Sequence, residues 1–472
     1  MSTITQTAVP ADRMPRHERL VLALACLGSF VVILDATIVS VALPDVRTEL
    51  GFSPAALPWV VNAYTLAFAG FLLLGGRCAD VFGRRRVLFA GMSLFTLASL
   101  AGGLAVSPWM LLAARAVQGL GGALLIPSTL SVLTSTFTEG ARRARVLSTW
   151  SAVGAVAAAA GPVLGGVLTQ WLGWRWVFFV NVPVGVVALI GVVTVLPRHD
   201  RSGKRGRLDL VGAVLATAGL VGVVYAVMES SAAGWGSAQV LGALAAGVVL
   251  LGIFLLHQAR WAADPLMPPA IFRVRSVSSG NVVMFLLGLG FFAGPLLISF
   301  DLQYVHGFTP LQAGVGFLPM GVAMFAGARS AGALTVRFGA RRAAIGCLVV
   351  GALGFAWMAV ALADAQATYL FSVALPGLVF GFGTSSAFTP ITVAATSGVP
   401  ATQNGVAAGL LNTIRQTSGA VGLAVITTLA AAVSAGESPA ALAHGYSAAF
   451  IFSACCVATA AVVAAFSMPR TA

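Results

Sequence analysis

The segment Leu20–Leu43 reads LVLALACLGSFVVILDATIVSVAL, and Asp35 is its one charged side chain in an otherwise apolar run. At the rise of an α-helix the segment measures about 36 Å, enough to cross the roughly 30 Å hydrocarbon core of a bilayer. It therefore predicts a transmembrane helix. An ionised Asp in the middle of such a helix costs on the order of 3 kcal/mol, so Asp35 should face a partner or a hydrated cavity. A local role, as a cap or a bond to Thr37 or to a neighbouring helix, is the alternative.

The composition extends this pattern to the whole chain. Hydrophobic residues make up 58% of it and charged residues only 9%, which indicates a polytopic membrane protein. The net charge of +13 does not indicate a nucleic-acid partner, because the basic residues stand between apolar runs rather than along one polar stripe. The cysteines are odd in number and lack metal-ligand spacing, so we expect packing residues and neither a metal site nor a cofactor. They are Cys26, Cys78, Cys347, Cys455 and Cys456.

Fourteen segments are long and apolar enough to span a membrane, so the predicted fold class is an all-α membrane protein with 14 transmembrane helices. The first is too long for the apolar core of a signal peptide and should be retained. The segments are 20–43, 57–76, 87–106, 109–130, 146–168, 176–196, 210–228, 240–256, 277–304, 311–336, 343–363, 369–393, 405–433 and 446–466.

The arginines predict the orientation. Most of the 27 basic residues fall in the two termini and in the loops after even-numbered segments, whereas only Arg47 and Arg175 fall in the opposite loops. Short cytoplasmic loops are enriched in Lys and Arg, so both termini should be cytoplasmic.

A weak internal repeat predicts two bundles. Residues 76–85 read GRCADVFGRR after the second segment, and residues 332–341 read GALTVRFGAR after the tenth. The polar loops 197–209 and 258–276 bracket the seventh and eighth segments. We expect an N-terminal six-helix bundle (1–196), a linker with two inserted helices (197–276) and a C-terminal six-helix bundle (277–472), as in transporters that rock two halves about a central site.

The loop at 76–86 follows the pattern G-x-x-x-D-x-x-G-R-R-R, which resembles the signature of the major facilitator superfamily. In that family the cluster latches the two halves together on the cytoplasmic side, which implies this role for Gly76, Asp80, Gly83, Arg84 and Arg85. Glycine at the turn permits a positive φ that other residues disfavour. A group of arginines that only fixes orientation is the alternative.

Residues 111–121 follow L-x3-R-x2-Q-G-x-G, which is similar to a pattern in proton-coupled members of the superfamily. Arg115 and Gln118 share one helix face, which we expect to line the cavity. Asp35 lies roughly 12 Å from the outer end of its segment and Arg115 roughly 10 Å, so the two can be level. We predict that they approach directly or through one polar intermediary and couple transport to protons. A purely structural Arg115 is the alternative.

Residues 161–166 read GPVLGG, which resembles the motif of the antiport branches. Proline removes a helix hydrogen bond, and glycines admit a neighbouring helix at close range. Gly161, Pro162, Gly165 and Gly166 therefore predict a hinge or a tight seal. An ordinary kinked packing helix is the alternative.

Three further stretches, 34–44, 174–185 and 403–419, look like the fourteen-span drug:proton antiporter family. The resemblance covers essentially the whole chain and implies a bacterial inner-membrane exporter of hydrophobic or amphipathic compounds, monomeric, with the substrate, protons and lipid as its partners. A proton-coupled uptake symporter, a passive facilitator, and a membrane-embedded enzyme or receptor are the rivals. The chain has no phosphate-binding loop of the Walker type and no nucleophile triad, so we expect neither ATP hydrolysis nor another enzyme activity.

Other polar residues lie within or beside the segments. Arg415 is near the middle of its segment, where it would meet an anionic substrate group or pair within the C-terminal half. Asn62 and Tyr64 could reach the cavity. Asp301 falls near the outer end of its segment, where a solvated interfacial acid is expected.

Overall fold

The structure is a computed structural model that describes residues 14–137, 140–197, 208–364, 366–399, 404–434, 436 and 438–469. Its described residues form helices joined by short loops, with no strand among them. Fourteen helical segments in this part of the chain are long and apolar enough to cross a membrane, which confirms the predicted fold class. Helices suit this setting because a helix satisfies its own backbone polar groups where no water is present.

The first half of the chain contributes the helices up to residue 195. They are α1 (Arg16–Leu50), α2 (Trp59–Phe82), α3 (Arg84–Gly103), α4 (Pro108–Thr136), α5 (Gly140–Leu172), α6 (Trp176–Phe179) and α7 (Asn181–Val195). Within this half α2 packs on α4, α1 on α5, and α3 on α4 and α7. The sixth span is broken at Val180, where α6 ends and α7 begins.

The second half forms a separate set of close packings. Its elements are η1 (Pro269–Arg273), α10 (Arg275–Phe291), α11 (Gly294–Phe300), η2 (Asp301–Val305), α12 (Pro310–Gly316), α13 (Leu318–Phe338), α14 (Ala340–Leu362), η3 (Leu370–Ala374), α15 (Leu375–Thr396), α16 (Asn404–Val433) and α17 (Pro439–Ser467). Here α14 packs on α15 and α17, α13 on α15, and α10 on α16 and α17.

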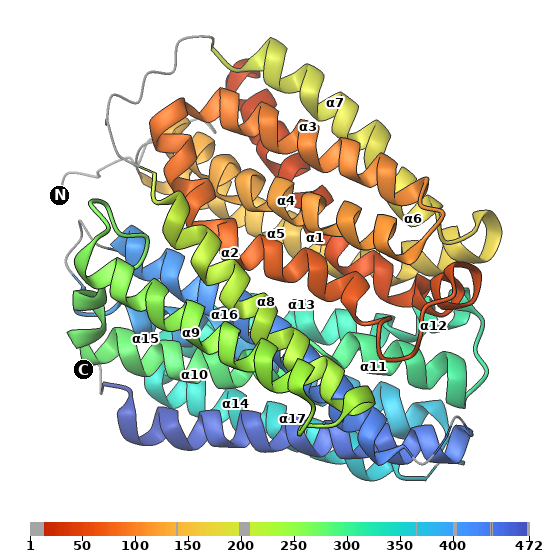
Figure 1. Cartoon of the computed structure of the whole chain (residues 1–472). Helices are drawn as coiled ribbons and strands as arrows, with labels where there is room; N and C mark the ends of the chain where they lie inside the picture. The colour runs from red at the N-terminus through yellow and green to blue at the C-terminus, as the bar shows by residue number, and fades with distance from the viewer. Residues whose placement is uncertain are drawn as a thin grey trace, which may run out of the picture.

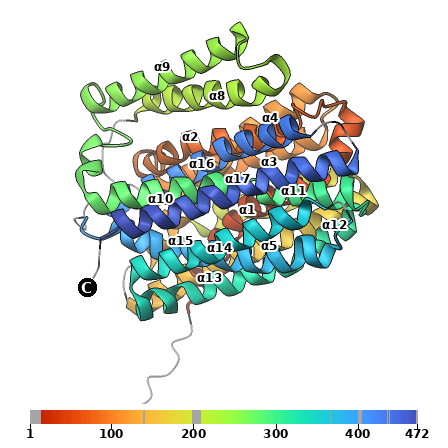
Figure 2. The ribbon, with the colours of Figure 1, turned by 90° about the horizontal axis from the view of Figure 1, so that it is seen from below.

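Two helices, α8 (Leu210–Ala233) and α9 (Ala238–Arg260), lie between the two halves in the sequence and pack mainly on each other. Figure 2 shows this pair at one edge of the molecule, where α8 faces α2 and α16. Asp209 caps the start of α8 through Gly212 N and accepts hydrogen bonds from His257 and Gln258 near the end of α9. The division into bundles at residues 196 and 277 stays a proposal that these packings suit.

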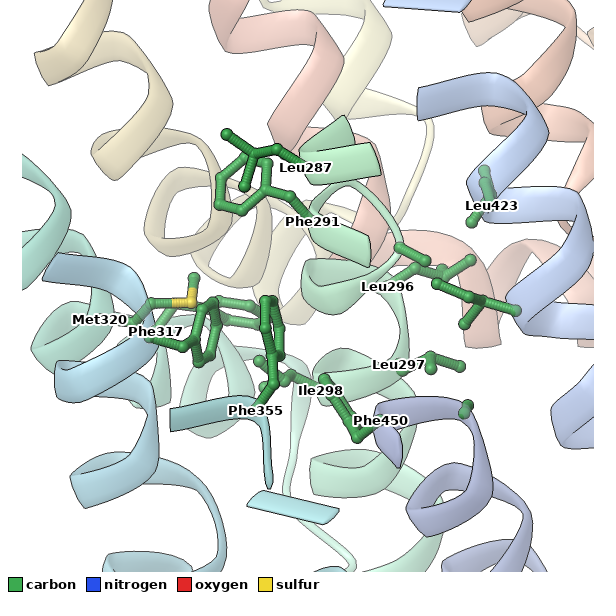
Figure 3. Packing of buried hydrophobic residues seen from close by; sticks show 14 of the residues in the cluster. Leu287, Phe291, Leu296, Leu297, Ile298, Phe317, Met320, Phe355, Leu423 and Phe450 are labelled. Carbon is green, nitrogen blue, oxygen red and sulfur yellow. The ribbon is translucent and has the colours of Figure 1, made fainter. Parts of the chain in front are cut away.

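The second half has an aromatic centre that helps to fix its helices. Phe355 of α14 stacks on Phe380 of α15 with ring centroids 4.5 Å apart, and Phe450 of α17 lies 6.0 Å from Phe355. Figure 3 shows Phe355 and Phe450 in one apolar cluster with Phe291 and Phe317. Apolar side chains from several helices therefore form one packed core. Polar side chains buried in such a core are unusual, so each of them is a candidate for a functional role.

The two halves meet where α1 and α5 contact α11, α12 and α13, and again where α2 packs on α16 (Figure 1). A Cβ at Gly166 would lie 2.5 Å from the carbonyl oxygen of Pro310, so only glycine permits this approach. Ser299 Oγ donates to Ser40 O at 3.0 Å, and Gln303 Nε2 donates to Val41 O at 3.1 Å. These contacts lie toward the end of α1 that is remote from its start, and they hold the halves together there.

A hollow of about 540 Å³ lies nearer the start of α1 and α5. Phe30 of α1 and one face of α5 line it. The α5 residues are Arg145, Ser148, Thr149, Ala152, Val153 and Val156. The wall that α1 and α5 present is thus sealed against the second half at one end and hollowed at the other.

Candidate functional site

Asp35 lies in α1 and is fully buried, yet its carboxylate is not isolated. Arg115 Nη1 donates to Oδ2 at 2.5 Å, Gln118 Nε2 donates to Oδ1 at 2.7 Å, and Asn181 Nδ2 donates to Oδ1 at 2.9 Å. We call Asp35, Arg115, Gln118 and Asn181 the acid network. It joins α1, α4 and α7 inside the first half, and the predicted direct approach of Asp35 to Arg115 is present.

Arg115 is fixed on several sides. Its Nε donates to Val60 O at 2.9 Å, and its Nη1 also reaches Gln118 Oε1 at 2.9 Å. The guanidinium carbon lies 4.4 Å from the ring centroid of Tyr64, which places the cation over an aromatic face. A Cβ at Gly119 would clash with the backbone of Tyr64, so glycine one residue after Gln118 lets α4 lie against α2.

The network explains how a charged pair is tolerated away from water. Burying an ion pair costs several kcal/mol per ion unless the geometry is good and the other hydrogen-bonding positions are filled. Both Asp35 oxygens have donors, and Arg115 has two acceptors besides Asp35. Adding a proton to Asp35 would remove the charge that holds Arg115, so protonation would weaken the contact between α1 and α4.

Asn181 lies in the stretch 174–185, for which the sequence predicted no role in the network, and none was predicted for Ser99, which accepts from Gln118 Nε2 at 2.7 Å. Asn181 is a polar residue in the first turn of an apolar span, and this was the signal that could have identified it. Its contact with Asp35 depends on how α7 crosses α1, which periodicity within one helix does not determine.

The other predicted cavity residues of the first half are buried in this state. Gln118 belongs to the acid network, and Tyr64 lies beneath Arg115 with its hydroxyl donating to Val32 O at 3.3 Å. Asn62 Nδ2 faces the sulfur of Met228 in α8 at 3.2 Å. Their role in binding substrate stays a prediction for a state in which these contacts open.

Arg415 differs from Arg115 in its surroundings. Its Nη2 donates to Asn412 Oδ1 at 2.7 Å, and its guanidinium carbon lies 5.6 Å from the ring centroid of Phe388. Its Nε is buried without a hydrogen-bond partner, and no acid of the described chain pairs with it. Within the C-terminal half Arg415 therefore pairs with the Asn412 amide, and no acid of the described residues joins it.

The stretch predicted as a loop at 76–86 is helical except at Gly83, which links the end of α2 to the start of α3. Gly83 has φ +89°, a region that favours glycine, and Gly76 lies against Pro127 of α4. Arg84 Nε donates to Ser131 Oγ at 2.8 Å, and Arg85 Nη2 donates to Val193 O at 3.0 Å. These bonds stay within the first half. The side chain of Asp80 lies outside the described residues, and the latch between halves stays a prediction.

The glycines of the GPVLGG stretch sit at contacts, with Pro162 inside α5. A Cβ at Gly161 would overlap Thr37, and one at Gly165 would lie 2.5 Å from Ile38 O, both in α1. Gly166 faces α12 of the second half instead. The geometry suits a seal, with two glycines packing α5 on α1 and the third packing it across the boundary; the role itself remains a proposal.

The expectation for Asp301 was wrong. Its side chain is only 1% exposed, because η2 turns it inward and His306 Nδ1 covers it at 3.2 Å from Oδ2. This contact with the Asp301 carboxylate raises the pKa of His306 to about 8, against the opposing effect of its partial burial. Tyr446 of α17 also lies close enough to Asp301 to interact with it electrostatically.

Comparisons with known proteins agree with this architecture. A family model described as Major Facilitator Superfamily matches residues 25–423. The chain is 45% identical to the cephamycin export protein CmcT of Amycolatopsis lactamdurans, covering 91% of this chain and 88% of the relative. It is 38% identical to the puromycin resistance protein pur8 of Streptomyces alboniger, covering 91% and 87%. A solved D-xylose-proton symporter has a TM-score of 0.69 at 16% identity, covering 96% and 98%, which supports the fold alone.

Proposed function

The chain belongs to the major facilitator superfamily, and from this premise we propose that it exports a hydrophobic or amphipathic compound in exchange for protons. The names of its relatives describe export of cephamycin and resistance to puromycin, which supports efflux as the direction of transport. The relatives are transporters, which gives no support to an enzyme activity.

The single observation that carries the proposal is the acid network. Asp35 is a buried carboxylate whose partners lie on two other helices, α4 and α7. A group of this kind has two states with different contacts, and only such a difference can shift an equilibrium between conformations. Protonation would release Arg115 and loosen the first half, whereas loss of the proton would restore the network.

The cycle follows from where the halves touch. If both termini are cytoplasmic, as the arginines predict, the Gly166 to Pro310 contact closes the outer side, and the hollow at Phe30 faces the cytoplasm. The substrate enters from the cytoplasm or inner leaflet while Asp35 is ionised. Opening of the outer seal then releases the substrate, and Asp35 takes a proton from outside that it returns to the cytoplasm after reclosure. The proposed setting is the bacterial plasma membrane.

Replacing Asp35 with Asn tests the proposal, because the amide keeps the shape but cannot carry a transferable charge. In everted vesicles, an imposed pH gradient should drive accumulation of a substrate found by a toxicity screen in wild type and not in D35N. Asp45→Asn is the matched control, since Asp45 lies on the same helix outside the acid network.

Unchanged transport by D35N, with normal insertion, would contradict the proposed mechanism. Substrate leaving the everted vesicles under the same gradient would indicate uptake in the cell, and transport without any response to the gradient would indicate a passive facilitator.

A further inference from the structure

Arg415 is a cation placed where a membrane protein rarely leaves one unmatched. It lies about 16 Å from the start of α16, which puts it near the middle of that span. The helix packs on α10, α15 and α17 of its own half and on α2 and α8. A guanidinium at this depth is costly unless something compensates its charge.

The described neighbours compensate it only in part. Asn412 accepts one hydrogen bond from Nη2, while Nε has no partner, and within the described residues no carboxylate lies within ion-pair distance. The side chain keeps partial exposure although Nε itself is buried. Leaving a buried donor without an acceptor costs about 1–3 kcal/mol, and more for a charged group. The Arg415 guanidinium therefore has at least one N–H group, on Nε, that no acceptor of the described residues satisfies.

The walls beside Arg415 are aromatic. The guanidinium carbon is 5.6 Å from the centroid of Phe388, whose ring meets Phe291 of α10 at 5.6 Å with a nearly perpendicular orientation. Figure 3 shows Phe291 beside Leu287 of the same helix. A ligand with an anionic head and an apolar or aromatic body would satisfy the charge and the walls together.

We propose that Arg415 and Asn412 form a binding site for an amphipathic carboxylate, with Arg415 donating to the anionic oxygens and Phe388, backed by Phe291, packing against the apolar body. This inference rests on the proposed export function and names the substrate class: compounds that carry a negative charge. Charge-assisted hydrogen bonds to carboxylate should favour the anion over a neutral analogue by about tenfold or more in affinity.

Arginine labelling tests the site without requiring transport. The full chain is purified into nanodiscs of zwitterionic phosphatidylcholine and treated with phenylglyoxal, and the labelled arginines are quantified by peptide mass spectrometry. 4-Phenylbutyrate should protect Arg415 at concentrations about tenfold lower than 4-phenylbutanol. Arg115 should resist labelling throughout, because its ion pair is buried. Arg175, paired with Glu49 on a partly exposed face, should label equally with either compound.

Three outcomes would overturn the inference: no labelling of Arg415, equal protection by acid and alcohol, or protection by chloride and sulfate as strong as that by 4-phenylbutyrate. The last would mean a general anion site. An Arg415→Lys variant should keep the preference for acid over alcohol in equilibrium dialysis, whereas Arg415→Gln should lose it. None of these readouts uses a proton gradient. If the Asp35→Asn experiment contradicts proton antiport, the binding result at Arg415 still stands. If Arg415 does not bind the carboxylate, the test of proton antiport is unaffected.

Discussion

The two halves of this transporter each bury an arginine, and they treat it in opposite ways. Arg115 of the first half has a carboxylate at 2.5 Å, two other acceptors and an aromatic face. Arg415 of the second half has one amide oxygen and an aromatic face. The first arrangement satisfies its charge within the protein, and the proposed mechanism assigns its response to a proton. The second has no carboxylate partner among the described residues, and the proposed binding site assigns that place to a ligand.

The buried acids show a parallel contrast. Asp35 has three donors from two other helices, whereas Asp301 is covered by His306, five residues further along the chain. Breaking the contacts of Asp35 therefore loosens the packing of several helices. Breaking the contact of Asp301 affects one turn, η2, of the second half.

Replacing each arginine in turn should give the largest difference in the free energy of unfolding between the two halves. Arg115→Gln leaves Asp35 buried without its cation, and breaking a buried pair in this way costs about 3–5 kcal/mol. Arg415→Gln removes a charge that has no counter-ion in the described chain, so its cost should stay under about 1 kcal/mol. Unfolding of the purified protein in detergent, followed by heat or denaturant, measures both.

The double variant Asp35→Asn, Arg115→Gln supplies the control, since it removes both charges and should recover part of the stability lost in Arg115→Gln. Equal losses of stability for Arg115→Gln and Arg415→Gln would mean that Arg415 has a charged partner. The two halves would then not differ in how they compensate a buried arginine.

The seal between the halves should respond to a single methyl group. Gly166→Ala places a Cβ 2.5 Å from Pro310 O, and such overpacking costs about 1–3 kcal/mol in the closed seal. The population should move toward a state that is open at this end. Spin labels at Thr48 and Gln366, on opposite halves, should report a longer distance by pulsed electron resonance.

Gly332→Ala is the matched control, because a Cβ there meets nothing within 4 Å. If both variants leave the distance unchanged, the close approach at Gly166 does not control the opening of the halves.

The sequence could predict the fold and the central pair because both depend on distances along single helices. Apolar run length gives the span count, and depth from the helix ends brought Asp35 level with Arg115. Asn181 joined the network without a predicted role because its contact is made across helices. Asp301 was misjudged because the end of an apolar run does not reveal that a π-turn folds the acid inward beneath His306. The sequence thus left open the crossing of α7 over α1 and the local fold of one turn, neither of which follows from the length or depth of a single apolar run.

His306 should make the second half sensitive to pH. Its pKa is about 8 when folded and about 6.5 when unfolded, so the stabilisation is complete below about 6.5 and is lost as the pH rises through 8. The change should amount to at most about 2 kcal/mol. Thermal unfolding midpoints measured from pH 6 to 9 should fall in this window in wild type and fall less in His306→Asn. A drop of the same size in both proteins would assign the pH dependence to another group.

The smallest expected effect concerns a single hydrogen bond between the halves. Ser299 Oγ donates to Ser40 O at 3.0 Å, and Ser299→Ala should weaken the closed seal by about 1 kcal/mol, a roughly fivefold change in the ratio of closed to open molecules. Ser330→Ala is the control, because Ser330 Oγ bonds only within its own helix, to Gly327 O. The spin-label pair at Thr48 and Gln366 should show a larger open fraction in Ser299→Ala alone. The shift should be smaller than that of Gly166→Ala, because one hydrogen bond contributes less than a steric overlap. The reverse order would mean that hydrogen bonding, rather than close glycine packing, holds the halves together at this end.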